Sequence, residues 1–119
     1  MATCLDVAGV KYPKEHKGKK LTPPEGRSLI PAFDDKPIER DGIYWEHEGN
    51  RAVRVGRWKL VAKGPAAPWE LYDLEADRTE THDLVAKHPG RVKEMAAKGE
   101  AWARRTNVLP WVWKPAYGG

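Results

Sequence analysis

The chain has 119 residues, of which 40% are hydrophobic, and it carries a formal net charge of +4. This length suits one domain rather than two, and no apolar run approaches the roughly 20 residues that a membrane-spanning helix needs. The composition therefore excludes an integral membrane protein, and we expect no membrane partner. The single cysteine, Cys4, excludes an internal disulfide and a cysteine-based metal cluster.

Residues 1–41 are predicted to form the end of a helix and an extended lead-in. Residues 1–8 have the pattern of the last turns of a helix, and Gly9 supplies a C-terminal stop. The connection that follows carries five prolines and many charges, and we expect order only at residues 28–33. The basic run from Lys14 to Lys20 is most simply a solvated surface, so we expect no nucleic-acid partner there.

Residues 42–74 contain four short runs that are rich in aromatic and β-branched residues and bounded by Gly or Pro. This pattern is typical of consecutive antiparallel strands, because the connections are too short for a crossover helix. Residues alternate in character along each run, so that Trp58, Leu60 and Ala62 share one face. The sequence therefore predicts a meander with one covered face and one partly wet face.

The turns of this meander are also predicted from the sequence. Residues 48–50 suit a hairpin loop of about three residues, because Gly and Asn tolerate positive φ. Val55 and Gly56 are expected to make the second turn, although Val is a poor residue where φ must be positive. The longer loop 64–68 contains two prolines, and Trp69 is expected to open the last strand.

Three carboxylates follow the last strand, at Asp73, Asp77 and Glu80. Such a group raises the possibility of a calcium loop, but it lacks the alternating ligand spacing and the Gly of such a loop. We therefore expect these side chains to stabilise turns and caps, and we expect no metal ligand among them.

A helix is predicted from Pro89 to Arg105, since Pro is favourable at the first helical position. Its apolar residues recur at helical spacing and form one stripe: Val92, Met95, Ala96, Gly99, Trp102 and Ala103. Gly99 is expected to allow close approach to the sheet beneath Trp58 or Trp69. The fold class is therefore α+β, with a small antiparallel sheet of about four strands (about 42–74) packed by one long C-terminal helix (about 89–105).

The sequence contains none of the common catalytic or cofactor-binding motifs, such as a Gly-rich phosphate loop, a Cys-x-x-Cys pair or a nucleophile elbow. Residues 46–51 are the one candidate site, because a strand ends there at a tight turn. His47 could donate a proton or bind an anion, and Arg51 could clamp a charged ester. The alternative is a hairpin rim with solvated charges, and we assign no residue as catalytic.

Several linked motifs resemble the C-terminal region of bacterial arylsulfatase-type sulfatases. They are Trp45-Glu-His-Glu-Gly-Asn-Arg-Ala-Val-Arg54, Gly56-Arg-Trp-Lys-Leu-Val61, Trp69-Glu-Leu-Tyr-Asp-Leu74 and Asp77-Arg-Thr-Glu80. Residues 1–9 resemble the helix before this region, and residues 109–111 resemble its ending. Arg78 and Asp83 depart from the pattern, which usually has Pro and Asn there, and these changes affect turn stiffness more than chemistry.

The resemblance implies that residues 42–119 are a small subdomain docked on a large α/β domain of an enzyme that hydrolyses sulfate esters. His47, Asn50 and Arg51 would then lie nearest the substrate. That family uses a formylglycine, made from cysteine, and a calcium ion. Cys4 is followed by Leu-Asp-Val-Ala, which does not match the conversion motif, and the family's calcium and sulfate ligands are not matched either.

We therefore expect this chain to be a segment of a longer enzyme, inactive by itself and without a cofactor of its own. Its expected partner is the missing N-terminal sulfatase domain, which would supply calcium and formylglycine. The whole enzyme is expected to be periplasmic or secreted, whereas nothing indicates where the segment alone would be. The alternative is a non-enzymatic binding module that uses its tryptophans and basic surface for glycans or nucleic acid.

Overall fold

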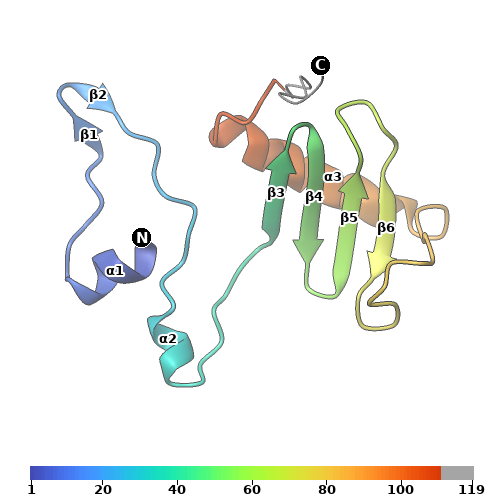
Figure 1. Cartoon of the computed structure of the whole chain (residues 1–119), viewed down its shortest axis with the longest axis horizontal. Coiled ribbons are helices and arrows are strands. Elements are labelled where there is room, and N and C mark those ends of the chain that lie inside the picture. Colours follow the sequence, from blue (N-terminus) through green and yellow to red (C-terminus); the bar gives the residue numbers. More distant parts are fainter. Residues whose placement is uncertain (111–119) are drawn as a thin grey trace, which may run out of the picture. The chain divides into compact units, whose positions relative to one another are not determined.

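A computed structural model of the chain describes residues 1–110, and it divides into two units, Met1–Arg40 and Asp41–Gly119. The first unit, called here the lead-in unit, contains α1 (Ala2–Val7), β1 (Glu15–His16), β2 (Lys19–Lys20) and α2 (Ile30–Phe33) (Figure 1). The second, called the sheet unit, contains β3 (Ile43–His47), β4 (Asn50–Val55), β5 (Trp58–Ala62), β6 (Glu70–Asp73) and α3 (Pro89–Arg105).

Helix α1 ends at a glycine, as the sequence predicts. Gly9 has a φ of 62°, its N–H donates to the Asp6 carbonyl at 3.1 Å, and the Val10 N–H donates to the Leu5 carbonyl at 2.9 Å. These two bonds satisfy carbonyls at the end of the helix and form a Schellman ending. Only glycine adopts this φ without steric cost, so Gly9 determines where α1 stops.

The β1–β2 hairpin corrects our expectation that only residues 28–33 of the lead-in are ordered. Glu15 pairs with Lys20 and His16 with Lys19, and the two turn residues between them, Lys17 and Gly18, have φ values of 49° and 74°. Two successive residues with positive φ make the turn whose twist matches that of paired strands. Lysine is not a usual residue at such a position, which is why this hairpin could not be predicted from the local sequence.

The sheet unit confirms the predicted meander, with strand order β3-β4-β5-β6 and antiparallel pairing throughout. Tyr44, Val53, Leu60 and Leu71 lie opposite one another across the four strands. Val53, Leu60 and Leu71 are buried, and together with Met95 of α3 they form the core. The helix therefore covers one face of the sheet (Figure 1), and the alternation seen in the sequence selects that face.

The strand ends differ from the predicted ones by one residue. Asn50 pairs with His47, so the first loop has two residues, Glu48 and Gly49, rather than three. Val55 pairs with Trp58, so the second turn is Gly56–Arg57. This shift places glycine, with a φ of 57°, where positive φ is needed and leaves Val55 in the strand. Strand β6 begins at Glu70, one residue after the expected position.

Helix α3 spans Pro89–Arg105, as predicted, and buries Met95, Gly99 and Ala103. A Cβ atom added at Gly99 would lie 2.7 Å from Cγ2 of Val53. The predicted close approach is thus confirmed, but its partner is Val53 on β4 and neither of the two tryptophans that we expected. The stacking of Tyr44 on Trp102, with ring centroids 5.4 Å apart, joins β3 to the same helix.

Helix α3 also has a Schellman ending, like α1, with asparagine in place of glycine at the residue of positive φ. Asn107 has a φ of 59°, its N–H donates to the Arg104 carbonyl, and the Val108 N–H donates to the Ala103 carbonyl at 2.9 Å. Asn107 therefore terminates the helix. Residue 111, the last of the three residues that resemble the ending of the family's C-terminal region, lies outside the described residues.

Replacing Gly99 by Ala is expected to destabilise the sheet unit. The gain in helix propensity is about 1 kcal/mol, whereas overpacking against a buried, stiff β-branched side chain costs about 1–3 kcal/mol. Urea unfolding should therefore show a net loss for Gly99→Ala, and the added Val53→Ala substitution should lower the cost of the new methyl group. Ala97→Gly, at an exposed position of the same helix, measures the propensity difference alone. A more stable Gly99→Ala variant would contradict the close packing.

Candidate functional site at the hairpin end of the sheet

The β3–β4 turn is built by its own backbone and one carboxylate. Glu48 and Gly49 both have positive φ, at 52° and 82°, which suits a two-residue hairpin loop. The Gly49 N–H donates to Oε1 of Glu46 at 2.7 Å. Glu46 therefore acts within the turn, and the turn fixes the positions of His47 and Asn50 at its two sides.

Asn50 links this turn to the loop between β5 and β6. Its Nδ2 donates to the His47 carbonyl at 3.0 Å, and its Oδ1 accepts a hydrogen bond from the Gly64 N–H, also at 3.0 Å. Both ends of the amide are thus used in holding two loops at the same end of the sheet. Gly64 has a φ of 87°, so the backbone at this junction needs a glycine.

Arg51 anchors the same loop from the helix-facing side of the sheet. Its Nη1 donates to the Pro65 carbonyl at 2.9 Å, its Nη2 lies 3.5 Å from the Ala67 carbonyl, and its guanidinium carbon lies 4.6 Å from the centre of the Trp69 ring. Burial lowers the pKa of the Arg51 guanidinium from its ordinary value. A guanidinium bound to carbonyls and stacked on an indole positions a proline-containing loop.

The structure therefore brings the three predicted site residues to one end of the sheet but gives them different surroundings. The side chain of His47 is exposed, whereas those of Asn50 and Arg51 are engaged with the loop 64–68. All three border an open cleft of about 330 Å³ on the sheet face opposite α3, together with Trp45, Lys59 and Lys63. His47 is thus the one of the three whose side chain faces solvent at this cleft.

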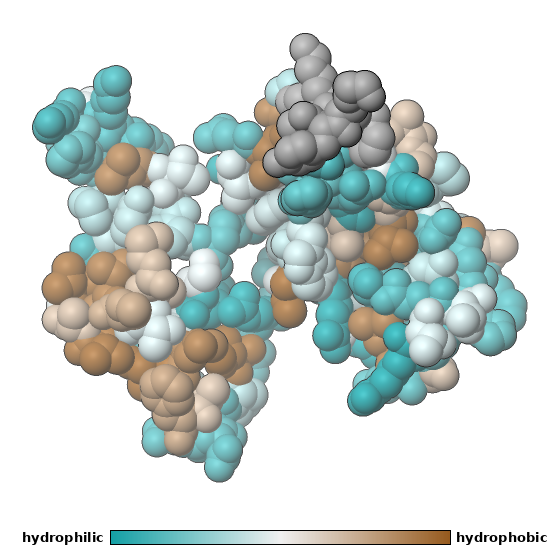
Figure 2. Space-filling view, in the orientation of Figure 1, coloured by the Kyte–Doolittle hydropathy of each residue, from teal (hydrophilic) through white to brown (hydrophobic). Residues whose placement is uncertain are grey.

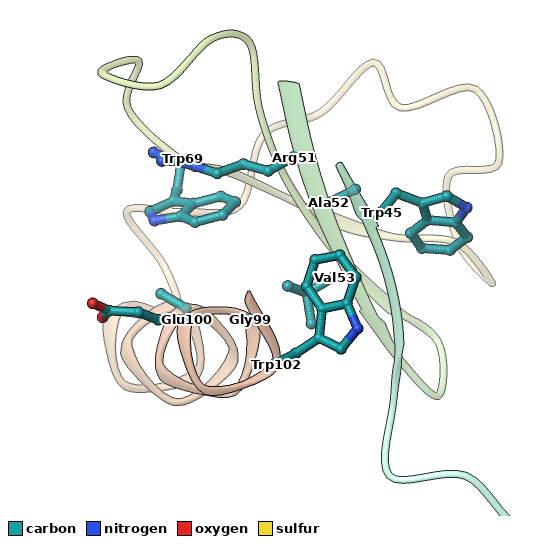
Figure 3. A pocket seen from close by; sticks show the side chains of 9 residues that line it. Trp45, Arg51, Ala52, Val53, Trp69, Gly99, Glu100 and Trp102 are labelled. Atoms are coloured by element: carbon teal, nitrogen blue, oxygen red, sulfur yellow. The ribbon is translucent and has the colours of Figure 1, made fainter. Parts of the chain in front are cut away.

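A second cleft, of about 250 Å³, lies between the sheet and α3, and sequence reasoning did not single it out. In Figure 3, Trp69, Trp102 and Glu100 lie around it, with Arg51 reaching across Trp69 and Trp45 pointing to the other side of the strands. The sequence predicts Trp102 on the apolar stripe of α3 and Trp69 at the start of the last strand. Their meeting at one cleft depends on the register of four strands and the phase of a helix, which the sequence does not display.

Of the three predicted carboxylates, Asp73 is the last residue of β6, and Asp77 and Glu80 follow it. Those of Asp73 and Asp77 stabilise turns, as predicted, whereas that of Glu80 binds a side chain of β5. Asp73 binds Arg57, Glu80 binds Nζ of Lys59 at 2.6 Å, and Asp77 accepts hydrogen bonds from the Thr81 and His82 N–H groups, each at 2.8 Å. Within residues 1–110, no group of three or more His, Cys, Asp or Glu side chains is arranged to hold a metal ion. These residues thus do not fit the calcium site of the family that the sequence resembles.

Cys4 does not fit a formylglycine nucleophile either, because it is an exposed thiol on α1 and lacks the conversion motif. Among residues 1–110, no helix has the length and the apolar character that crossing a membrane requires.

Acid is expected to destabilise the turn around Asp77. Burial alone would raise the pKa of this carboxyl, but hydrogen bonds from the His82 and Thr81 N–H groups and from the Thr81 and Thr79 hydroxyls lower it from 3.8 to about 2. A pKa lowered by folding adds stability above the unfolded value, and this stability is lost as the pH falls through about 4 to about 2.

The measurement is the urea midpoint of the whole chain between pH 6 and pH 2. Asp77→Asn should lower the midpoint at pH 6 and flatten its dependence on pH below about pH 4. Glu39→Gln neutralises an exposed carboxylate in the lead-in unit, and its urea midpoint should depend on pH as that of the parent chain does. Equal slopes for the parent chain and Asp77→Asn would show that the turn does not depend on this charge.

Known proteins share the sequence pattern and the architecture of this chain. No family model matches the chain. It is 31% identical over 116 residues to an uncharacterized sulfatase of Schizosaccharomyces pombe, a match that covers 92% of this chain and 21% of the yeast protein. The chain therefore spans about a fifth of the length of this curated relative.

Solved structures agree with that match. The crystal structure of Ps i-CgsB in complex with k-i-k-neocarrahexaose has a TM-score of 0.65 at 24% identity, over 95% of this chain and 25% of that one. BT1596, described as a 2-O GAG sulfatase, has a TM-score of 0.63 at 25% identity, over 88% of this chain and 24% of that one. The chain is thus a relative of the sulfatases and matches a C-terminal quarter of them in sequence and fold.

Proposed function

We propose that this chain is the C-terminal portion of a sulfatase, an enzyme that hydrolyses sulfate esters, and that it completes the fold and the substrate cleft without being active by itself. The observation that carries the proposal is the match of 92% of the chain to 21% of a sulfatase. An N-terminal sulfatase domain would be the partner and would supply the formylglycine nucleophile and the calcium ion. The residues described here offer neither.

The test is a chimera in which this chain replaces the matching segment of the S. pombe sulfatase. Hydrolysis of an aryl sulfate such as 4-nitrophenyl sulfate is measured for the intact yeast protein, for the protein without that segment and for the chimera. The chimera should recover turnover that the shortened protein lacks. A folded chimera no more active than the shortened protein would count against the proposal, and so would turnover by the 119-residue chain alone.

We further propose that the hairpin end of the sheet borders the substrate, with His47 as the side chain that meets it. His47 is exposed beside the open cleft and can donate a hydrogen bond to an anionic ester. Asn50 and Arg51 would act there mainly by holding the loop 64–68 in place. All three residues thus belong to the site, but His47 would contact the substrate, whereas Asn50 and Arg51 would position the loop.

The two roles make different predictions for variants of the chimera. His47→Ala should raise KM at least about tenfold, as expected for loss of a charge-assisted contact, and leave the thermal midpoint unchanged. Arg51→Ala should instead lower the thermal midpoint, because the Pro65 carbonyl and the Trp69 face lose their partner. Lys63→Ala, at an exposed position lining the same cleft, is the matched control. Unaltered kinetics for His47→Ala would remove His47 from the substrate site.

The alternative of a tryptophan-rich binding module for glycans or nucleic acid is not favoured. Within residues 41–110, Ile43 and Trp45 are the exposed large hydrophobic residues. Trp58, Trp69 and Trp102 are partly buried and contact His88, Arg51 and Tyr44, respectively. A stacking platform for bases or sugars needs open indole faces in a row. Strong quenching of tryptophan fluorescence by acrylamide would revive that alternative.

A further inference from the structure

The lead-in unit carries an apolar surface without a core beneath it. None of residues 1–40 is buried. Large hydrophobic side chains are exposed on or beside its two helices: Val7 at 70%, Val10 at 56%, Leu29 at 48% and Phe33 at 72%. We call these four residues the α1–α2 patch. Figure 2 shows hydrophobic surface gathered over α1 and α2, and such a patch on a natural protein usually marks an interaction site.

The backbone that presents this patch is nevertheless ordered. The Leu29 N–H donates to Oγ1 of Thr3 at 3.0 Å, which ties the start of α2 to α1. The Schellman ending at Gly9 fixes the exit of the chain from α1. Hydrogen bonds of this kind define a shape, but they do not offset the conformational entropy of a 40-residue unit without buried apolar surface. The unit therefore needs another surface to cover its patch.

The length of the match to the yeast sulfatase indicates which surface covers the patch. The sheet unit begins at Asp41, so a match over 92% of the chain must include most of the lead-in unit as well. The lead-in unit is thus part of the sulfatase-like segment rather than an unrelated extension. About four fifths of the yeast sulfatase lies outside the match. In that protein, the segment that matches the lead-in unit belongs to the same chain as this remainder.

We propose that the α1–α2 patch is the surface by which this segment docks on the remainder of a sulfatase, with Phe33 and Val7 as the anchoring side chains. The inference rests on the function proposed above and names the docking surface. The partner surface is an apolar depression with a polar rim, because charged residues flank Phe33 directly at Asp34, Asp35 and Lys36. Buried apolar anchors surrounded by a polar rim are the usual arrangement of such interfaces.

The test compares Phe33→Asp in the chimera and in the isolated 119-residue chain. Trypsin cleavage after Arg27, an exposed residue just before α2, reports whether the lead-in unit is covered. Cleavage in the chimera should be at least about tenfold slower than in the isolated chain, and Phe33→Asp should abolish most of that protection, as expected for losing a buried aromatic anchor. Val7→Asp, on α1, should act in the same direction.

The control is Thr22→Asp, which adds the same charge at an exposed position of the lead-in unit and should keep the protection. Equally fast cleavage of the chimera and the isolated chain would overturn the proposal. So would a lower thermal midpoint of the isolated chain with Phe33→Asp, because the sheet unit would then cover the patch. A dimer of the isolated chain that Phe33→Asp dissociates would assign the patch to a second copy.

The two proposals fail in different ways. Cleavage after Arg27 does not depend on turnover, so the docking surface is read even from an inactive chimera. Protection that Phe33→Asp removes, in a chimera without sulfatase activity, would support docking and reject the proposed function. An active chimera whose Arg27 site stays protected in Phe33→Asp and Val7→Asp would support the function and reject the docking surface.

Discussion

Replacing Leu60 by Ala is expected to lower the free energy of unfolding of the sheet unit by about 2–5 kcal/mol. Leu60 is completely buried at the centre of β5, opposite Val53 on one side and Leu71 on the other. Removing its side chain takes away buried apolar area and leaves a cavity that a two-layer unit can fill only in part. Small domains are stable by about 5–15 kcal/mol in total, so this loss is a large fraction of the stability available.

Val61 provides the matched control, because it is the next residue of the same strand and lies on the opposite, partly exposed face. Val61→Ala should cost about 1 kcal/mol or less. Urea unfolding of the 119-residue chain, followed by tryptophan fluorescence, measures both variants. Similar midpoints for the two variants would mean that the face covered by α3 is not the core of the sheet unit.

The core could be predicted from the sequence because its signals are local and periodic. Leu60 and Leu71 follow the alternation of strands, and Met95 and Ala103 follow the spacing of one helix face, so each signal lies within a single element. The packing of helix against sheet then follows, since two apolar faces in a small chain have few other partners. Even the close approach at Gly99 was predicted, although its partner strand was not.

The turns were predicted less well, because their boundaries depend on φ rather than on hydrophobicity. Gly56 occupies the first turn position and Val55 stays in the strand, a difference of one residue that alternation alone does not resolve. Glu48 and Lys17 adopt positive φ without being glycine or asparagine. In each case the residue that follows is glycine, so the second turn position carried the only local signal.

The surroundings of the candidate site could not be predicted, because they join residues far apart in the chain. Asn50 reaches Gly64, and Arg51 reaches Pro65, across 14 positions in each case. Nothing in the local sequence distinguishes an arginine that binds a substrate from one that binds the carbonyls of a loop. Only the structure shows that Arg51 has loop partners, and it thereby leaves His47 as the side chain of the three that faces solvent.

Replacing Arg57 by Ala is expected to destabilise the sheet unit by about 1–3 kcal/mol, the cost of leaving a buried acceptor without its charged donor. The side chain of Asp73 is only 6% exposed. Its Oδ1 accepts hydrogen bonds from Nε of Arg57 at 2.8 Å and from the Glu75 N–H at 3.1 Å, and its Oδ2 binds Nη2 of Arg57. The loss is smaller than for a fully buried pair, because the Arg57 side chain is 44% exposed and screened by water.

The geometry makes this prediction specific to arginine. Two guanidinium nitrogens bind the two carboxylate oxygens of Asp73, and the ammonium of lysine cannot reproduce that fork, so Arg57→Lys should lose part of the stability as well. Asp73→Asn should reduce the cost of Arg57→Ala, because it removes the buried charge that the arginine compensates. Lys98→Ala, which breaks a 4.0 Å pair with Glu94 on the helix surface, should change the urea midpoint little. If Arg57→Ala behaves like Lys98→Ala, Asp73 does not need its partner, and the turn between β4 and β5 is held by its backbone alone.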